Sequence, residues 1–350
     1  MLMRVDDLIV YANDKKASDI HLIFGLPPKC RVNGRLESMA DFILNDEDCD
    51  NYAMELARYR YEDFLEAGEM DLARTIEGIR VRINLFRQQD HTSVVIRLLN
   101  DKIPVLESLG LPEEVESLTE LKRGIVIVTG QTGSGKSTTL ASLIDRINHT
   151  RDCHVITLED PIEYIYEPDL SIFNQREIGR DTKSYESGLR SVLREDPDVI
   201  LIGEMRDTIT METALKAAET GHLVLTTLHT GSAAEVVDRI VDSFPEARQQ
   251  QIRLQLSLTL MAVLAQQLLP KKDGSGRIPA CEFMLVNPAI RNLIREGKSP
   301  QIDNVISTTA DKGSVTMDNA IIKLYRDKKI SSRTALFAAK NLEFVTRNIT

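Results

Sequence analysis

The chain has 350 residues, 42% of them apolar and 27% charged, and its formal net charge is −10. Domains of about 150 residues are typical, so this length suggests two domains. The negative balance disfavours a nucleic-acid-binding protein, although a local basic patch is compatible with it. No apolar run approaches the roughly 20 residues of a membrane span, and the start MLMRVDDLIV has acids where a secretory signal is apolar. These features favour a soluble, intracellular protein.

The cysteines are dispersed along the chain without any CxxC pair: Cys30, Cys49, Cys153 and Cys281. Zinc knuckles and disulfide frameworks depend on regular cysteine spacing, so neither is expected. We expect buried free thiols in a reducing compartment instead. The chain has no tryptophan and only 5% aromatic residues, so no platform for stacking nucleic-acid bases is evident.

Short strands separated by turns dominate the chain before residue 105. The dipeptides Asn33-Gly34 and Glu77-Gly78 are suited to tight turns, which predicts two hairpins. A further strand and two helical stretches complete a small α+β domain over residues 1–100. The predicted elements are hairpins at 29–38 and 70–89, a strand at 91–100 and helices near 4–16 and 46–67.

Pro104, Gly110 and Pro112 punctuate the next segment, 101–123, which we interpret as a linker between domains. Beyond it, short apolar runs alternate with stretches of helical periodicity. Such alternation indicates an α/β domain with a mostly parallel sheet, whose strands are buried on both faces. The predicted strands are 124–130, 154–160, 171–177, 198–204 and 222–229.

The chain is expected to be mainly helical from about residue 232 to the end of a second domain, 124–350. The run LQLSLTLMAVLAQQLLP, 254–270, is too short and too rich in glutamine for a membrane span, and we interpret it as a core helix. A hairpin is expected around the turn DGSG at 273–276. A short helix follows in NPAIRNLIREG, 287–297, with asparagine as its N-cap, proline at its first position and glycine past its end.

The segment GQTGSGKS, 130–137, fits the phosphate-binding pattern GxxxxGK[ST] and lies between an apolar strand and a helical stretch. Its glycines let backbone N–H groups surround phosphate oxygens, and the helix N-terminus adds a favourable dipole. We expect the Lys136 ammonium to reach the β- and γ-phosphates of ATP, and the Ser137 hydroxyl to bind Mg²⁺. The candidate nucleotide-binding residues are Gly130, Gln131, Thr132, Gly133, Ser134, Gly135, Lys136, Ser137 and Thr138.

The strand DVILIGE, 198–204, ends on a carboxylate, Glu204. A nucleotide-bound Mg²⁺ needs a carboxylate near the phosphates, usually at the end of a neighbouring strand. The usual pattern has aspartate one place earlier, where this chain has Gly203, so we expect Glu204 to act alone, on the metal through water, as a base, or both. The alternative is an acid at a helix N-terminus that packs against Arg206.

Glu159, Asp160 and Glu163 form an acidic cluster in the segment LEDPIEY, 158–164. Strand ends of an open parallel sheet face its ligand crevice, so one of these carboxylates can orient or deprotonate the attacking water. A solvated acidic loop is the alternative.

His222 and His229 flank the strand HLVLTTLH, seven residues apart. Side chains alternate along a strand, so the two imidazoles point to opposite faces and are expected to differ in role. His229, at the ligand-facing end, is the candidate γ-phosphate sensor. His222 is either a further nucleotide contact or structural.

Arg80 and Arg82 share one face of the strand IRVRINLF, and Arg97 lies in the next strand. The simpler interpretation is the solvated side of an antiparallel sheet. The alternative is that these guanidinium groups neutralise phosphate charge across a subunit boundary, as arginine fingers do.

The helix in NPAIRNLIREG has Ile290, Leu293 and Ile294 as its buried stripe, whereas Arg291 and Arg295 face elsewhere. The two arginines form either a solvated basic face or a surface that docks a partner. Spacing alone leaves both interpretations open.

Five segments together resemble those of the secretion ATPase superfamily, and specifically the type IV pilus retraction ATPases of the PilT type. They are GQTGSGKST, LEDPIEY, LREDPDVILIGEMRD, TGHLVLTTLHT and AIRNLIRE, and the similarity covers nearly the whole chain. AIRNLIRE discriminates best, because pilus assembly and type II secretion ATPases share the other boxes. The resemblance implies a PAS-like α+β N-terminal domain, then a RecA-like P-loop ATPase domain whose helical C-terminal part begins at about residue 287.

The resemblance also implies an activity and an assembly. It implies a homohexameric ring that binds ATP and Mg²⁺ and hydrolyses ATP to drive pilus retraction and twitching motility. Such a ring lies in the cytoplasm, at the inner face of the cytoplasmic membrane. It associates with the membrane peripherally, through an inner-membrane pilus platform protein, and binds no nucleic acid.

Matching the motifs residue by residue implies individual roles. The implied roles are Walker A for Lys136 and Ser137, the Walker B acid for Glu204, the base for Glu163, the histidine box for His222 and His229, and nucleotide contact for Arg80, Arg82 and Arg97. The implied retraction motif is Ala289, Ile290, Arg291, Asn292, Leu293, Ile294, Arg295 and Glu296.

Three other functions stay open at this point. They are an ATPase of pilus assembly or type II secretion, a nucleic-acid-translocating motor on a RecA-like core, and a regulatory subunit that binds ATP without turnover. The lack of a tetracysteine zinc insertion and of a longer N-terminal region favours retraction over assembly. The full set of Glu163, Glu204 and His229 favours turnover over binding alone.

Overall fold

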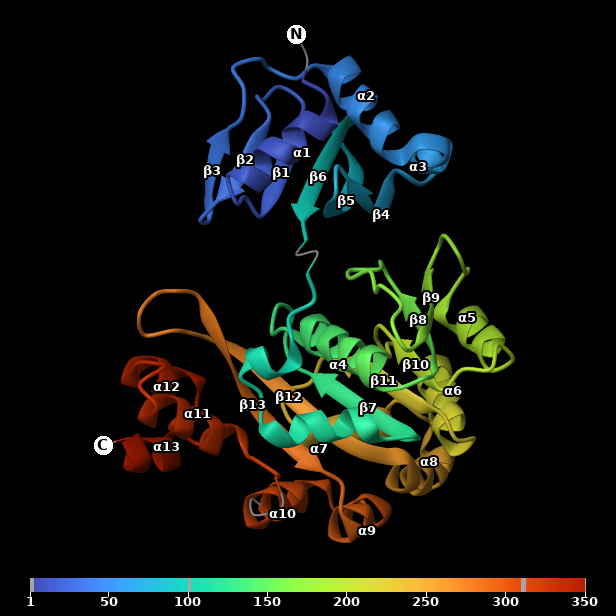
Figure 1. Ribbon diagram of the computed structural model, residues 1–350, viewed down its shortest axis with the longest axis vertical. Coiled ribbons are helices and arrows are strands. Elements are labelled where there is room, and N and C mark those ends of the chain that lie inside the picture. Colours follow the sequence, from blue (N-terminus) through green and yellow to red (C-terminus); the bar gives the residue numbers. More distant parts are fainter. Residues whose placement is uncertain (1–2, 100–101, 310–312, 350) are drawn as a thin grey trace. The chain divides into compact units, whose positions relative to one another are not determined.

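The computed structural model describes residues 3–99, 102–309 and 313–349 (Figure 1). The chain divides into two compact units. The first is Met1–Lys102 with Pro161–Ile165, and the second is Ile103–Asp160 with Tyr166–Thr350. The boundary expected between residues 100 and 101 falls on Asn100 and Asp101, which lie outside the described residues.

The first unit is built on a six-stranded sheet of order β3-β2-β1-β6-β5-β4, in which every pairing is antiparallel. Both predicted hairpin turns are confirmed, with positive φ at Asn33 and Gly34 (49° and 82°) and at Glu77 and Gly78 (49° and 78°). The strands are β1 (Asp19–Ile23), β2 (Lys29–Val32), β3 (Arg35–Ser38), β4 (Glu69–Ile76), β5 (Ile79–Gln88) and β6 (His91–Leu98), and the helices are α1 (Val5–Asp14), α2 (Asp46–Ala57), η1 (Arg58–Arg60) and α3 (Tyr61–Ala67).

The second unit is built on a seven-stranded sheet of order β13-β12-β7-β11-β10-β8-β9. All neighbours are parallel except β12 and β13, so the predicted mostly parallel sheet of an α/β domain is confirmed. Its strands are β7 (Gly124–Thr129), β8 (His154–Glu159), β9 (Ile172–Glu177), β10 (Val199–Ile202), β11 (Leu223–Leu228), β12 (Leu260–Pro270) and β13 (Arg277–Leu285). Each residue of β7, β10 and β11 is buried, because helices cover both faces.

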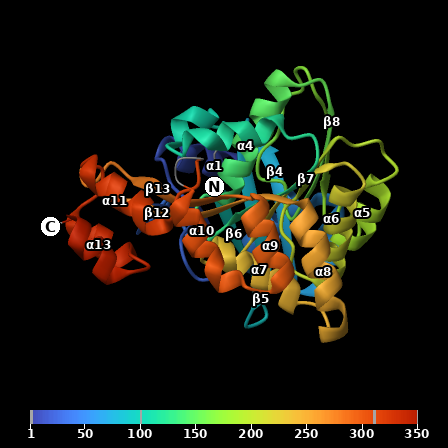
Figure 2. The same ribbon diagram turned by 90° about the horizontal axis from the view of Figure 1, so that it is seen from below.

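The helices of the second unit carry most of its apolar core against this sheet. α8 packs against both α7 and α9, and the three helices lie together in Figure 2. A separate apolar cluster joins α11, α12 and α13 to the β12–β13 hairpin. The helices are η2 (Leu106–Leu109), η3 (Glu113–Glu120), α4 (Lys136–Thr150), α5 (Tyr185–Val192), α6 (Thr208–Glu219), α7 (Ala233–Asp242), α8 (Glu246–Thr259), α9 (Pro288–Glu296), η4 (Ser299–Gln301), α10 (Ile302–Thr308), α11 (Met317–Arg326), α12 (Ser332–Ala338) and α13 (Leu342–Ile349).

The prediction of one core helix over residues 254–270 is wrong. Helix α8 ends at Thr259, and Leu260–Pro270 is strand β12, paired with β7 and β13. Most of this strand is buried, so its apolar run lacks the alternation that separates a strand from a helix. The hairpin expected around residues 273–276 is confirmed, since it joins β12 to β13.

Helix α9 has the ends that its sequence predicts. The Asn287 side chain accepts a hydrogen bond from the Ile290 N–H at 2.9 Å, Pro288 stands at the first helical position, and Gly297 follows with φ of 67°. All four cysteines are buried and free. Across the described ranges, none of the helices combines the length and apolar character that a bilayer crossing requires.

Candidate functional site

The loop between β7 and α4 has the backbone of a phosphate-binding loop. Gly130, Gly133 and Gly135 have φ of 144°, 77° and 92°, in the region that favours glycine. The loop leads directly into α4, a helix of 15 residues that begins at Lys136. The N-terminus of this helix therefore adds its dipole to the N–H groups of the loop.

Gly130 is in close contact with a neighbouring strand. A β-carbon at this position would stand 2.2 Å from the Gln266 carbonyl oxygen of β12 and 2.6 Å from the Ser134 hydroxyl. No side chain fits there unless the backbone of β12 moves. The strand that sequence analysis interpreted as a helix thus forms the wall of this loop.

Lys136 folds back onto the loop that precedes it. Its side chain is only 8% exposed, and its ammonium donates to the carbonyl oxygens of Gly130 at 2.8 Å and Gln131 at 3.0 Å. The Ser134 hydroxyl is buried and makes no hydrogen bond to any described residue. Gln131, Thr132 and Ser137 are exposed at the same loop. An ammonium and several hydroxyls therefore surround the place that a phosphate chain would occupy.

Glu204 and His229 meet at the ends of adjacent parallel strands, β10 and β11. The His229 Nε2 atom lies 3.2 Å from the Glu204 Oε2 atom, and the other carboxylate oxygen of Glu204 pairs with Arg206. Burial lowers the pKa of His229, and so do the charges of Lys136 and Arg206. The imidazole is therefore neutral at pH 7. Strand β11 separates β10 from β7, so Glu204 is one strand further from the loop than expected.

Three threonines connect the strand ends at this edge of the sheet. The Thr129 hydroxyl accepts a hydrogen bond from the Thr230 N–H at 2.9 Å and lies 2.9 Å from the Thr230 hydroxyl. The Thr227 hydroxyl donates to the Gly203 carbonyl at 2.6 Å. The sequence alone does not reveal these residues, because a threonine in an apolar strand has no spacing that marks it as functional.

Gly203 occupies the place where the usual pattern has aspartate. A β-carbon here would lie 2.8 Å from the Tyr185 hydroxyl and 3.4 Å from the Leu158 carbonyl oxygen. Burial raises the pKa of Tyr185, as do the nearby charges of Asp160 and Glu159, so the phenol stays protonated. The tyrosine of α5 thus explains why this chain has glycine before its acid.

The acidic cluster of 158–164 is divided between the two units. Glu159 is 9% exposed and accepts a hydrogen bond from the Thr157 hydroxyl at 2.7 Å. Asp160 follows it and is exposed, also in the second unit. Glu163 is half-buried and lies in Pro161–Ile165, which belongs to the first unit.

His222 lies at the other end of β11 from His229. Its Nδ1 atom is 2.8 Å from the Ala217 carbonyl oxygen and 3.1 Å from the Thr220 hydroxyl, both at the C-terminal end of α6. These contacts cap a helix end. The structure therefore does not place His222 with Glu204 and His229.

Three arginines lie together on one face of the first unit's sheet. Arg82 on β5 stands opposite Arg97 on β6, and Arg80 precedes Arg82 by two residues. Arg82 pairs with Asp71 at 3.7 Å, and Arg97 with Asp19 at 3.0 Å.

Arg80 differs from the other two arginines. Its side chain is 8% exposed and donates a hydrogen bond to the Ile162 carbonyl, at 2.6 Å, within the same unit. The structure thus brings Arg80, Arg82 and Arg97 together on one face, with two of them paired to carboxylates.

Arg291 of α9 interacts with the end of α8. Its guanidinium donates to the carbonyl oxygens of Ser257 and Leu258, the latter at 3.0 Å, where α8 gives way to β12. A cation at a helix C-terminus stabilises carbonyls that have no partner inside the helix. Arg295 is exposed and contacts Asn292 of its own helix at 3.4 Å. The two arginines of this helix therefore differ in role.

Comparison with known proteins identifies relatives that match nearly the whole chain. Residues 4–329 match the sequence profile of the family described as type II/IV secretion system protein. The type IV pilus retraction ATPase PilT of Pseudomonas aeruginosa is 42% identical over 97% of this chain and 98% of its own length. A twitching motility protein of Neisseria gonorrhoeae is 42% identical over 90% of this chain and 85% of its own length.

A solved structure agrees with these matches. A crystal structure of the pilus retraction motor PilT with bound ADP superposes on the chain with a TM-score of 0.92. It is 44% identical in sequence, and the match covers 99% of both chains.

Proposed function

This chain belongs to the family of type II/IV secretion system proteins, and we propose that it is an ATP-hydrolysing motor that drives the retraction of type IV pili. The observation that carries the proposal is the match of 42% identity to a pilus retraction ATPase along almost the full length of both proteins. The Gly-rich loop, Lys136, Glu204 and His229 supply groups that such an activity needs.

The loop and Lys136 bind the phosphates of ATP in this proposal. The ammonium that now contacts the Gly130 and Gln131 carbonyls moves onto the β- and γ-phosphates, and backbone N–H groups of the loop surround the same oxygens. The exposed Ser137 hydroxyl at the start of α4 and the Glu204 carboxylate are the residues that would hold Mg²⁺. Bound Mg²⁺ neutralises charge that develops on the phosphates.

The carboxylates and the imidazole act on the attacking water. Glu204, 14% exposed in its side chain, is positioned by His229 and Arg206 and polarises this water or holds it for the metal. Glu163 is the second candidate base. Neutral His229 is the γ-phosphate sensor in this proposal. Its imidazole N–H donates a hydrogen bond to a phosphate oxygen when the γ-phosphate is present and to Glu204 when it is absent. His222 is structural, since it caps α6.

The remaining assignments concern the assembly. The chain forms a homohexamer, and Arg80, Arg82 and Arg97 act on the nucleotide of a neighbouring subunit as arginine fingers. We place the N-terminal domain at residues 1–100, the linker at 101–123 and the ATPase domain at 124–350. The ring works in the cytoplasm, at the inner face of the cytoplasmic membrane, and acts on an inner-membrane pilus platform protein through a surface that includes 289–296.

A turnover assay on the purified chain tests the proposal. The wild type hydrolyses ATP, and Lys136→Ala lowers the rate by at least about 100-fold because the transferred phosphate loses its cation. Lys122→Ala, at an exposed lysine before β7, is the matched control and keeps the wild-type rate. Normal turnover by Lys136→Ala would contradict the site, and strong stimulation by single-stranded DNA would favour a nucleic-acid motor.

A deletion strain tests the direction of the motor. Cells that lack the chain accumulate pili that do not retract and lose twitching motility. Loss of pili in that strain would identify an assembly ATPase instead, and absence of turnover in the pure protein would identify a regulatory subunit.

A further inference from the structure

Glu282 is a carboxylate in the interior of the second unit, away from the loop and from Glu204. It lies in the middle of β13, its side chain is 2% exposed, and its strand partner is Ala265 of β12. Removal of a carboxylate from water costs several kcal/mol unless hydrogen bonds replace the lost hydration. The partners of Glu282 therefore reveal what the carboxylate holds in place.

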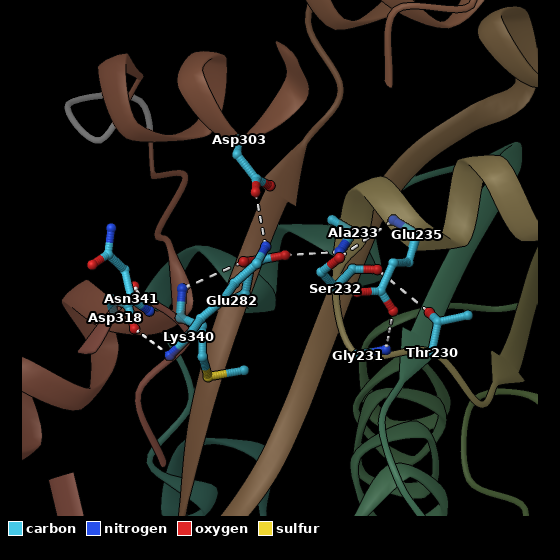
Figure 3. Close-up of polar contacts among 11 residues, drawn as sticks. Thr230, Gly231, Ser232, Ala233, Glu235, Glu282, Asp303, Asp318, Lys340 and Asn341 are labelled. Atoms are coloured by element: carbon cyan, nitrogen blue, oxygen red, sulfur yellow. Dashed lines mark hydrogen bonds and ion pairs between the residues drawn. The ribbon is translucent and has the colours of Figure 1, made fainter. Parts of the chain in front are cut away.

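Each oxygen of Glu282 accepts a hydrogen bond from the first residue of a different helix. Oε1 accepts from the Ala233 N–H of α7 at 2.7 Å, and Oε2 accepts from the Met317 N–H of α11 at 3.4 Å. The first N–H groups of a helix have no partner inside it, and the dipole there favours a negative charge. One carboxylate thus joins two helix N-termini, as Figure 3 shows for the α7 side.

Other charged groups lie close to Glu282. Lys340 lies nearby, and its ammonium donates to Asp303 at 2.8 Å. Burial, with a smaller effect of the Asp303 charge, raises the pKa of Glu282 above its ordinary value, although the Ala233 N–H and the charge of Lys340 act in the opposite direction. Burial by itself lowers the pKa of Lys340, but the hydrogen bond to Asp303 and the charge of Glu282 outweigh it and raise this pKa above its ordinary value. Lys340, Asp303 and Glu282 thus form a compact polar group between α7 and the C-terminal helices.

Helix α7 begins four residues after His229, and both ends of the intervening segment are held. At one end, the Thr230 N–H donates to the Thr129 hydroxyl at the end of β7. At the other end, the Ala233 N–H donates to Glu282. Between them, Ser232 caps α7 through the Glu235 N–H, at 3.3 Å. His229 is therefore placed by two anchors, and Glu282 supplies one of them.

We propose that Glu282 is a positioning residue for ATP hydrolysis, which holds the start of α7 and thereby keeps His229 against Glu204. The inference rests on the proposed function of the site. Nucleotide binding does not depend on Glu282, because the phosphate loop is anchored by β7, α4 and the wall of β12.

The substitution Glu282→Gln tests this assignment with little change of shape. Its amide can accept from one of the two N–H groups but presents its own NH₂ to the other, so one anchor is lost. We expect kcat to fall about tenfold, as when the partner that orients a catalytic group is removed. The dissociation constant for ADP stays at the wild-type value.

Asp318→Asn is the matched control. Both oxygens of Asp318 also accept from backbone N–H groups, those of Lys340 at 2.8 Å and Asn341 at 3.0 Å. These bonds join α11 to the turn between α12 and α13 and do not reach the segment 230–233. Asp318→Asn should lower the melting temperature as Glu282→Gln does, with kcat unchanged. An equal loss of kcat in both variants would overturn the proposal, because it would indicate a general effect of stability.

A double-mutant comparison shows whether Glu282 acts through His229. In a His229→Ala background, Glu282→Gln should lower kcat no further, since the group that it positions is already absent. If the double variant lost kcat by the product of the two single-variant factors, the assignment would be overturned. A wild type without turnover would overturn the proposed function and this inference with it. Normal wild-type turnover with an unaffected Glu282→Gln would overturn the inference alone.

Ala233→Pro is a second variant should Glu282→Gln fail to fold. Proline is favoured at the first position of a helix and removes the N–H that donates to Glu282, although its ring adds carbons at a buried position. Ser232 has the extended backbone (φ −150°, ψ 166°) that a residue before proline prefers. The same fall in kcat with an unchanged dissociation constant for ADP is expected, and wild-type kcat would overturn the proposal.

Discussion

Tyr185 places its hydroxyl 2.8 Å from the point that a β-carbon at position 203 would occupy. The tyrosine comes from α5 and the glycine from the end of β10, immediately before Glu204. Any side chain at 203 must displace this phenol or push the strand end away from Leu158. The identity of residue 203 therefore depends on a helix that contributes no candidate group to the reaction.

Gly203→Ala should destabilise the protein by about 1–2 kcal/mol, because the added methyl group overpacks a filled site. Tyr185→Phe removes the shortest contact, so the double variant Gly203→Ala, Tyr185→Phe should regain most of the loss. Thermal unfolding of the wild type and the three variants measures both effects. Equal destabilisation by Gly203→Ala with and without the hydroxyl would refute this packing argument.

Glu204→Gln should lower the turnover number by at least about 100-fold while ADP still binds. The amide keeps the shape of the side chain but cannot hold a metal-bound water or take a proton. Glu212→Gln is the control, since Glu212 also has two basic side chains as partners, Lys216 and Arg248, but lies on α6, outside the candidate site. Steady-state hydrolysis and fluorescent ADP titration of both variants provide the comparison. Near-normal turnover by Glu204→Gln would leave Glu163 as the base.

Acidification should lower the folding stability of the wild type more than that of the His229→Gln variant. Burial, with the charges of Lys136 and Arg206, lowers the pKa of folded His229 below the ordinary 6.5. Between that ordinary value and the lowered one, the unfolded chain binds a proton that the folded chain does not. The contribution to stability is therefore present above pH 6.5 and is lost as the pH falls through the lowered pKa.

Melting temperatures at pH 7.5 and 5.5 measure this difference. The decrease on acidification should be smaller for His229→Gln, because the titrating group is gone. Other histidines contribute equally to both proteins and cancel. An equal decrease in both proteins would show that the pKa of His229 is the same in the folded and unfolded chains.

Arg291→Ala should cost about 1 kcal/mol of stability, because the carbonyls at the end of α8 lose their cation. Arg295→Ala, one turn away on an exposed surface, should leave stability unchanged. If the helix docks a partner through Arg295, cells with Arg295→Ala lose pilus retraction, although the variant protein keeps its stability and its rate of ATP hydrolysis. Unfolding curves with a motility assay separate the two roles. Equal stability of both variants would contradict the capping role of Arg291.

Local chemistry explains which parts of the fold the sequence predicts. Gly34 and Gly78 mark the two hairpin turns because glycine accepts positive φ without strain. The end signals of α9 work for the same reason, since Asn287 and Gly297 act within a few residues of where they stand. Such signals do not depend on the rest of the molecule.

The errors arise where tertiary structure decides. No proline or glycine separates α8 from β12 at Thr259–Leu260, and a strand between two others is apolar on both faces, so 254–270 resembles one helix. Strand β1, Asp19–Ile23, was not predicted, because so short a pattern is recognisable only beside a marked turn such as the one between β2 and β3.

The candidate site shows the same limit. Lys136 is predictable because it belongs to the Gly-rich motif, and Glu204 because it stands at the end of an apolar strand. Glu282 could have been noticed as a single acid in the apolar run ACEFML. Its partners, Ala233 and Met317, could not have been found, because they are far away in the sequence.

The contact between Gly130 and the Gln266 carbonyl bears on how family motifs are used for annotation. Gly130 is required by the neighbouring strand, so a descendant that had lost its nucleotide would still keep this glycine as long as β12 kept its place. Gly133 has open space around its missing side chain and is constrained by its φ of 77° alone. Within one motif, then, some positions are fixed by packing against the sheet and others by the conformation of the loop. In a homologue that no longer binds nucleotide, only the positions fixed by the loop conformation would be free to change.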